Sequence, residues 1–198
     1  GGDALLIAVD LPSGKVVWKS ANPEQWQMTH ASLTPMEFKG RRMYVYCASG
    51  GVAGVSAPDG EILWLTPDWK ISMATIPAPL AVGEGRIFLS GGYNAGSMMI
   101  QLEEAAGKFK AQTLFKLKPN VFGATQHTPI LYENHILGVR PDGQFVCLDL
   151  NGKPVWESGS ATRFGLGPFM IAQGLLLAMN DDGLLTLAEA STTAWKRL

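Results

Sequence analysis

One pattern recurs along this chain at a nearly constant spacing. An apolar run meets an acidic or small residue, a turn with glycine follows, and a tryptophan comes four residues after that glycine. The three clear copies end in Trp18, Trp64 and Trp156, and the intervals between them are 46 and 92 positions. Because the second interval is twice the first, a copy is expected midway, where Gly107-Lys108-Phe109 lies without its tryptophan. A fixed period of this size predicts repeated supersecondary units that bury their faces against neighbouring repeats.

Each period also contains four short apolar segments bounded by Gly, Pro, Asn or Asp. In one period they begin with a proline-containing run at 33–36 and continue with 43–46. The third segment is the apolar run before the acidic position, and the fourth carries the repeat tryptophan. Such segments predict antiparallel strands joined by hairpins, and none shows a sustained helical spacing of apolar residues. Four antiparallel strands in about 40 to 50 residues predict one blade of a β-propeller.

The sequence therefore predicts an all-β propeller of four-stranded antiparallel blades, about four and a half of them. The expected blades are 33–66, 78–117, 128–158 and 168–197, preceded by a half blade at 4–18. The last blade is expected to be degenerate at its outer edge, since no glycine turn follows Glu189 and Trp195 comes late. We interpret 1–198 as a single partial propeller domain. Its open blade faces would need missing blades or self-association to cover them.

Composition limits the classes of partner. Lys plus Arg total 16 and Asp plus Glu total 17, so the formal net charge is −1. Without a basic run or a positive field, binding to nucleic acid is not expected. No apolar run approaches the ~20 residues of a membrane-spanning helix, and no export signal is visible. Cys47 and Cys147 lie two repeats apart and are expected to be buried free thiols.

The acidic residue, the glycine turn and the tryptophan, as in Asp149, Gly152 and Trp156, resemble the repeat of the pyrroloquinoline-quinone-type propellers. That family includes quinoprotein alcohol and glucose dehydrogenases and also non-catalytic, exported propeller proteins. The resemblance implies a ring of about eight blades and a periplasmic or secreted location. It also implies that each repeat tryptophan packs between neighbouring blades over a glycine turn. The residues expected in this structural role are Trp18, Trp64, Trp156, Gly14, Gly60 and Gly152.

The loops that join expected blades, together with the turns inside blades, predict a binding rim. These loops pair an aromatic residue with a cationic or imidazole group, which suits a peptide, a sugar, or an anionic or planar ligand. In the other interpretation, the aromatic residues cap the blade ends and the charges are solvated. The candidate rim residues are Trp26, His30, Trp69, Lys70, Tyr93, Asn94, Gln126, His127, Arg140, Arg163 and Phe164.

Two functions remain open at this level. The first is a non-catalytic platform, meaning a rigid scaffold that presents a loop-lined face to a partner protein or to a small-molecule or sugar ligand. The alternative is part of a pyrroloquinoline-quinone-dependent alcohol or sugar dehydrogenase, which would require the quinone and calcium.

The resemblance implies for such enzymes an aspartate base and, in many, two adjacent cysteines. Cys47 and Cys147 are not adjacent, and the loops between blades carry no acidic residue after Asp68. We therefore predict no catalytic residue, no metal site and no cofactor.

Overall fold

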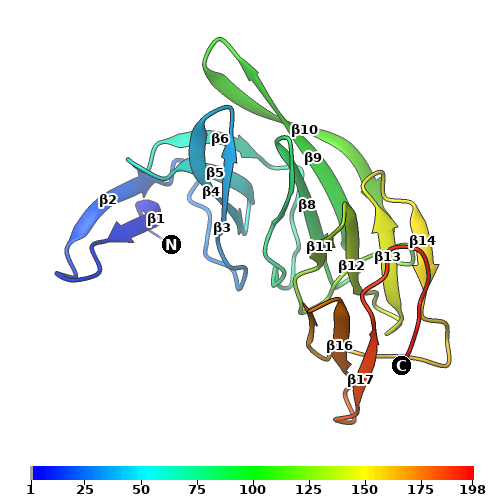
Figure 1. Cartoon of the computed structure of the whole chain (residues 1–198). Coiled ribbons are helices and arrows are strands. Elements are labelled where there is room, and N and C mark those ends of the chain that lie inside the picture. Colours follow the sequence, from blue (N-terminus) through cyan, green and yellow to red (C-terminus); the bar gives the residue numbers. More distant parts are fainter. Residues whose placement is uncertain (1) are drawn as a thin grey trace. The chain divides into compact units, whose positions relative to one another are not determined.

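The computed structural model describes residues 2–198 as strands, turns and loops, with no helix in that range (Figure 1). The expected all-β fold of antiparallel blades is confirmed. The strands are β1 (Ala4–Val9), β2 (Val16–Ala21), β3 (Thr34–Phe38), β4 (Arg41–Ala48), β5 (Gly51–Ser56), β6 (Ile62–Thr66), β7 (Leu80–Gly83), β8 (Arg86–Gly91), β9 (Gly96–Ala105), β10 (Lys108–Leu117), β11 (Ile130–Tyr132), β12 (His135–Val139), β13 (Phe145–Asp149), β14 (Pro154–Glu157), β15 (Phe169–Ala172), β16 (Leu175–Met179) and β17 (Leu185–Glu189). Within the described range, nothing has the helical length and apolarity needed to cross a membrane.

The strands form five sheets in which neighbours in sequence are also neighbours in the sheet. β1–β2 is a two-stranded sheet, β15–β17 has three strands, and the three sheets between them each have four. This order follows from the short turns, because a tight hairpin can only join adjacent antiparallel strands. The chain also divides into two compact units. The first runs up to Leu89 and includes Met99–Leu114, and the second contains Ser90–Met98 and Phe115–Leu198.

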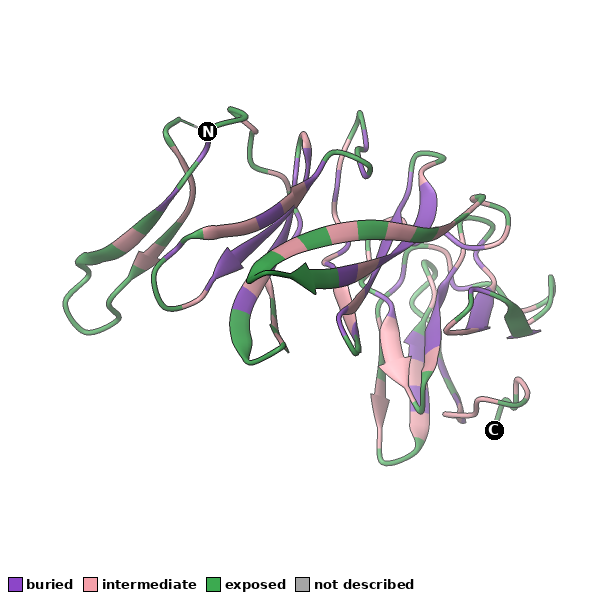
Figure 2. Cartoon of the chain, turned by 90° about the horizontal axis from the view of Figure 1, so that it is seen from above, coloured by how far each residue is buried: buried purple, intermediate pink, exposed green. Residues whose placement is uncertain are grey.

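In the first unit the core lies in the middle strands of the β3–β6 sheet. Every residue of β5 is buried, and so are Met43 and Val45 of β4. Strands buried on both faces need nearly continuous apolar sequence, which explains the apolar run read at 43–46. Figure 2 shows the buried positions concentrated in such inner strands, whereas the hairpin ends are exposed.

In the second unit the core is an aromatic cluster centred on Phe145. Its ring lies 4.8 Å from Phe169, 5.8 Å from Phe164 and 6.2 Å from Trp156, measured between ring centroids. Edge-to-face and offset pairs of this kind are favourable beyond the area that they bury. The cluster joins the β11–β14 sheet to the β15–β17 sheet.

The last sheet differs from the other blades at its outer edge. A single bridge between Ala188 and Arg197 stands where a fourth strand would lie. Trp195 folds back onto the preceding sheet, 5.7 Å from Trp156 and 6.1 Å from Phe145. Because no glycine turn follows Glu189, the chain passes through a loop before it returns, so only a short contact forms. At the other end, the expected half blade extends to Ala21 and consists of β1 and β2.

Two repeat tryptophans reach from their own sheet to the next one. Trp18 donates its indole N–H to the carbonyl of Ala57, 3.1 Å away, and its ring covers Gly60. Trp156 donates to the carbonyl of Ser191 at 3.0 Å. Trp64 behaves differently, because its indole N–H faces the Met43 sulfur of its own sheet at 3.4 Å. The family resemblance thus describes the contacts of Trp18 and Trp156 better than those of Trp64.

The repeat without a tryptophan is explained by a longer β9–β10 hairpin, which Figure 1 shows reaching beyond the neighbouring strands of its sheet. Leu102 donates its N–H to Gly85, as Ala57 does to Arg42, so Gln101 takes the place of Ser56. Trp64 follows Ser56 by eight residues, whereas Phe115 follows Gln101 by fourteen, so this hairpin contains six additional residues.

Phe115 therefore occupies the position that corresponds to the repeat tryptophan. A Cβ atom added to Gly152 would lie 2.7 Å from the Phe115 ring and 3.0 Å from Leu117. This is the arrangement of Trp18 over Gly60. Phe109, the aromatic residue that follows the expected Gly107 turn, instead contacts Phe38, with 5.9 Å between ring centroids.

Candidate functional site

In the first unit, the loop before β3 is fixed along the end of the β4–β5 hairpin. The Asn22 carboxamide accepts the N–H of Trp26 and donates to its carbonyl, each at 3.0 Å. The Trp26 ring lies on the turn, because a Cβ atom on Gly50 would be only 2.1 Å from its indole nitrogen. Trp26 is half-buried. It thus caps the end of a blade, as the second interpretation of the rim aromatics expected.

The next residues of this loop have hydrogen-bonded backbone groups, and two of their side chains are exposed. Gln27 donates its N–H to the Ser49 hydroxyl at 2.8 Å, and Thr29 donates its N–H to the Tyr46 hydroxyl at 2.8 Å. Met28, which lies between them, is 78% exposed, and His30 is exposed as well. A backbone held by hydrogen bonds therefore presents these two side chains to solvent.

The loop before β7 lies beside this one. His30 donates its N–H to the carbonyl of Thr75 at 3.0 Å, which joins the two loops. The second loop contributes Met73, which is 73% exposed, and the exposed Lys70. We call Met28, His30 and Met73 the methionine patch. The two methionines were not among the residues expected at the rim, although both lie in the predicted loops.

Trp69, expected on the rim, is buried instead, with only 6% of its surface exposed. Its indole N–H has no hydrogen-bond partner among the described residues. Because the ring is enclosed by the fold, it presents no face to a ligand, and we exclude it from the rim.

In the second unit, the β8–β9 turn is exposed and lies against the loop before β11. Tyr93 and Asn94 adopt left-handed backbone angles, with φ of 55° and 63°, and the Tyr93 side chain is 45% exposed. A Cβ atom on Gly92 would lie 2.7 Å from the methyl group of Thr125. The structure thus brings this turn next to the loop that carries the exposed Gln126.

His127 has a structural environment. Its Nε2 atom accepts the N–H of Val139 at 3.0 Å, and its ring meets Phe169 edge-on at 5.1 Å. Burial lowers the pKa of His127 to about 4, so the ring is neutral near pH 7. Since Nε2 accepts, the proton is on Nδ1, which has no partner among the described residues.

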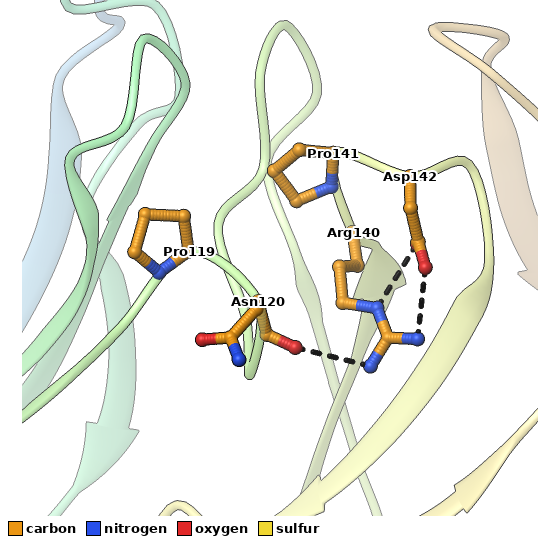
Figure 3. Close-up of a pocket in the computed structure, with 5 residues that line it drawn as sticks. All are labelled: Pro119, Asn120, Arg140, Pro141 and Asp142. Carbon is orange, nitrogen blue, oxygen red and sulfur yellow. Dashed lines mark hydrogen bonds and ion pairs between the residues drawn. The ribbon is translucent and has the colours of Figure 1, made fainter.

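Arg140 is held in a clamp formed by two carboxylates and a carbonyl. Its guanidinium donates twice to Asp142, at 3.0 Å, and twice to Glu157, at 2.7 and 3.0 Å. A fifth bond of 3.2 Å reaches the carbonyl of Asn120 (Figure 3). These bonds use the five N–H donors of the guanidinium, and the side chain is only 10% exposed. Arg140 therefore has no donor left for the anionic ligand expected at the rim.

A hollow of about 550 Å³ opens beside this clamp (Figure 3). It is lined by Pro119, Asn120, Arg140, Pro141 and Asp142. Burial acts to raise the pKa of Asp142, but hydrogen bonds from Arg140 and Gln144 outweigh it and lower that pKa to about 2. Arg140 and Asp142 are thus both charged near neutral pH and already paired with each other.

The last two expected rim residues are Arg163 and Phe164. Arg163 is exposed and donates from Nε to the carbonyl of Ser160 at 3.2 Å. Phe164 is 1% exposed and belongs to the core around Phe145. Phe164 therefore supports the loop from below, so it is removed from the rim.

The donor groups near the hollow do not suit the calcium of a quinoprotein enzyme. Each oxygen of Asp142 already accepts one bond from Arg140 and one from Gln144. A carboxylate with its acceptor sites filled is a poor ligand for a hard cation. Over residues 2–198, no three His, Cys, Asp or Glu side chains gather as a potential metal site.

The stacked antiparallel sheets, with aromatic residues of one sheet lying on the turns of the next, define a β-propeller built from pyrroloquinoline-quinone-like repeats. The chain belongs to the family of the outer membrane protein assembly factor BamB, whose family model matches residues 1–151.

A solved structure shows the same fold. BamB from Moraxella catarrhalis matches with a TM-score of 0.58 and 14% identity over 96% of this chain. The chain spans 56% of the length of that BamB. The computationally designed Ika8 protein matches with a TM-score of 0.46 and 10% identity, over 96% of this chain and 66% of its own. A search of curated proteins found no match.

Proposed function

We propose that this protein is a non-catalytic platform in the cell envelope that binds a partner protein through the methionine patch. Family membership supports the general role, since the family is described by a factor for outer membrane protein assembly. The periplasmic or secreted location is part of the same proposal. The observation that carries the binding role is the exposure of Met28 and Met73, at 78% and 73%, on adjacent loops.

The patch has the properties of an adaptable protein-binding surface. Methionine side chains are flexible and polarizable, so they fit partner surfaces of varied shape. Their loops are held by hydrogen bonds to the β4–β5 hairpin and to each other, so the backbone is already ordered before a partner arrives. An ordered backbone lowers the entropy lost on binding. Flexible side chains on a fixed backbone thus favour association with a protein.

The hollow beside Arg140 supports a small-molecule function less well. A site for a polar ligand needs a few convergent groups that are free to bond it. Arg140 and Asp142 instead bond each other, and Arg140 also bonds Glu157. A sugar in the hollow would have to compete with these charge-assisted bonds, which are among the stronger hydrogen bonds.

Site-specific photo-crosslinking tests the proposal. A photoreactive amino acid replaces Met28 or Met73 in the protein expressed in a bacterial envelope. Leu114, a 49% exposed apolar residue of β10, is the matched control position. We expect a discrete crosslinked partner from the loop positions and none from Leu114. The double variant Met28→Glu with Met73→Glu should lose the partner at least about tenfold while keeping the circular dichroism of the parent.

Two outcomes would contradict the proposal. Equal crosslinking from Leu114 would show that the patch is not the binding surface. Dye reduction with alcohols or sugars after addition of pyrroloquinoline quinone and calcium would favour the dehydrogenase alternative.

A further inference from the structure

The eight methionines of this chain differ widely in exposure. Met28 and Met73, the two methionines of the patch, are 78% and 73% exposed. Met43, Met98 and Met99 are 0% exposed and lie in the inner strands β4 and β9. An oxidant in solution must reach a thioether sulfur to react with it, so the fold exposes some methionines to oxidation and protects others. The remaining methionines have exposures between these extremes: Met36, Met170 and Met179.

The two methionines of the patch occupy equivalent positions in successive repeats. His30 donates its N–H to the carbonyl of Thr75 at 3.0 Å, and the Thr34 hydroxyl donates to the carbonyl of Pro79. Each bond joins residues 45 positions apart, so the two segments lie side by side at that offset. The two methionines are also 45 positions apart, and each comes two residues before the first of these bonds. The repeat therefore brings both thioethers to the same exposed patch.

A peroxide has the chemistry to modify such a pair. The thioether sulfur attacks one oxygen of hydrogen peroxide, so that an S–O bond forms while the O–O bond breaks. The departing hydroxide takes the proton of the transferred oxygen and leaves as water. Sulfur loses two electrons, the peroxide oxygens gain them, and the product is methionine sulfoxide. A flexible apolar side chain thereby becomes a polar one with a hydrogen-bond acceptor.

We propose that Met28 and Met73 form a modification site for peroxide-class oxidants, and that their sulfoxides release the protein partner of the patch. The release rests on the proposed function. A sulfoxide oxygen buried against an apolar surface without a hydrogen-bond donor costs free energy, so binding weakens. The loops keep their structure, because the hydrogen bonds that hold them use the main-chain N–H groups of Gln27, Thr29 and His30. Methionine sulfoxide reductase reverses the modification.

Site-resolved mass spectrometry tests the modification without a partner. The folded chain is treated with hydrogen peroxide for increasing times and then digested. We expect sulfoxide to form at Met28 and Met73 at least about tenfold faster than at Met43, Met98 and Met99, and this difference to vanish in urea. Circular dichroism should stay that of the untreated chain while the two patch methionines react. Equal rates at all five positions of the folded chain would overturn the proposal.

Photo-crosslinking tests the release. A photoreactive amino acid at Lys70, an exposed residue of the second loop, leaves both methionines in place. The purified protein is treated with peroxide, catalase removes the excess, and an untreated extract of bacterial envelopes is then added. We expect the yield of the crosslinked product to fall at least about tenfold after treatment and to return after incubation with methionine sulfoxide reductase.

Two double variants of the Lys70-labelled protein provide matched controls. Met28→Leu with Met73→Leu has side chains that form no sulfoxide, so peroxide treatment should not change its crosslinking yield. Met28→Gln with Met73→Gln carries a polar amide near the position of the sulfoxide oxygen, so its yield should be low without peroxide. A peroxide-dependent decrease in the leucine variant equal to that of the wild type would assign the effect to other residues and overturn the proposal.

The remaining outcomes separate this inference from the proposed function. An undiminished product after both methionines have been oxidised would overturn the inference and leave the proposed function standing. No product from the untreated Lys70-labelled protein would contradict the proposed function and the release together. The oxidation rates would then still decide whether Met28 and Met73 are the modification site.

Discussion

At the scale of single residues, the glycine of the repeat contributes differently to stability in different sheets. Gly14 and Gly60 both follow the acidic or small position by four residues, and both have left-handed φ angles, of 69° and 78°. Nothing lies within 4 Å of a Cβ atom added to Gly14, whereas one added to Gly60 would be 2.5 Å from the Trp18 ring. Gly14 is therefore needed only for its left-handed backbone angle, whereas Gly60 is needed both for that angle and for the contact with Trp18.

This difference gives a prediction with an internal control. Gly14→Ala should lower the free energy of unfolding by about 1 kcal/mol, the cost of a left-handed angle for alanine. Gly60→Ala should cost about 1–3 kcal/mol more, because the added methyl group displaces the indole. Urea unfolding followed by tryptophan fluorescence measures both. Equal losses for the two variants would show that the contact between Trp18 and Gly60 contributes no stability.

His127 links stability to pH. Its pKa is about 4 in the folded chain, against an ordinary value of 6.5. Between these values the unfolded chain binds a proton that the folded chain does not, so stability falls as the pH falls from about 6.5 to about 4. The expected slope approaches 1.36 kcal/mol per pH unit within this window.

His127→Gln is the matched variant, because it keeps an acceptor for Val139 but does not titrate. The urea midpoint of the wild type should decrease more steeply from pH 7 to pH 4.5 than that of the variant. Parallel decreases would mean that other groups, and not His127, set the acid sensitivity.

At the scale of secondary-structure elements, the β9–β10 hairpin shows how a repeat absorbs an insertion. Its six additional residues lengthen each strand by about three residues and move the turn outward. Because side chains alternate along a strand, the docking aromatic must then lie farther from the turn in the sequence to keep facing the next sheet. Phe115 rather than Phe109 then faces Gly152, and Phe109 is free to pack on Phe38. The hairpin thus keeps the contact between sheets and adds one contact near its tip.

The two phenylalanines should differ in their contribution to stability. Phe115→Ala removes the ring over Gly152 and should lower the free energy of unfolding by about 2–3 kcal/mol, below the range for a fully buried ring since Phe115 is half-buried. Phe109→Ala should cost less, about 1 kcal/mol, because it loses one ring pair near the hairpin tip. Phe115→Trp should retain most of the stability. Chemical unfolding of the three variants checks this order. A larger loss of stability for Phe109→Ala than for Phe115→Ala would show that Phe115 is not the docking residue.

Residue patterns predicted these elements with uneven success, for identifiable reasons. Alternation and turn residues located the strands, because those signals are local. The docking residue of the third repeat was missed, since a fixed distance from the expected Gly107 turn ignores a longer hairpin. The degenerate edge of the last sheet was predicted from the late Trp195, although its fold back onto Phe145 was not.

At the scale of the whole molecule, the proposals concern surfaces rather than an enclosed site. The near balance of 16 basic and 17 acidic residues leaves local features to decide association. The feature that carries the proposed binding role is the methionine patch on the loops of the first unit. Exposed apolar groups gathered on one surface commonly mark binding sites in soluble proteins.

The candidate site was predicted only at the level of loops. Sequence placed aromatic and charged residues between blades, and several of them do lie on exposed loops, such as His30, Lys70 and Tyr93. It could not tell which were buried, so Trp69 and Phe164 were included and Met28 and Met73 were omitted. Burial depends on how neighbouring segments pack, and a short stretch of sequence does not contain that information.

The sequence by itself determined the β-propeller class, because a period near 46 residues with glycine turns and tryptophans can bury its apolar faces only by stacking sheets. Tertiary structure alone decided which side chains remain available for binding. Arg140 shows the reason: it is one cation among many in the sequence, yet Asp142 and Glu157 take up its donors once the chain is folded. Availability is a property of distances between residues remote in the chain, and those distances exist only in the folded molecule.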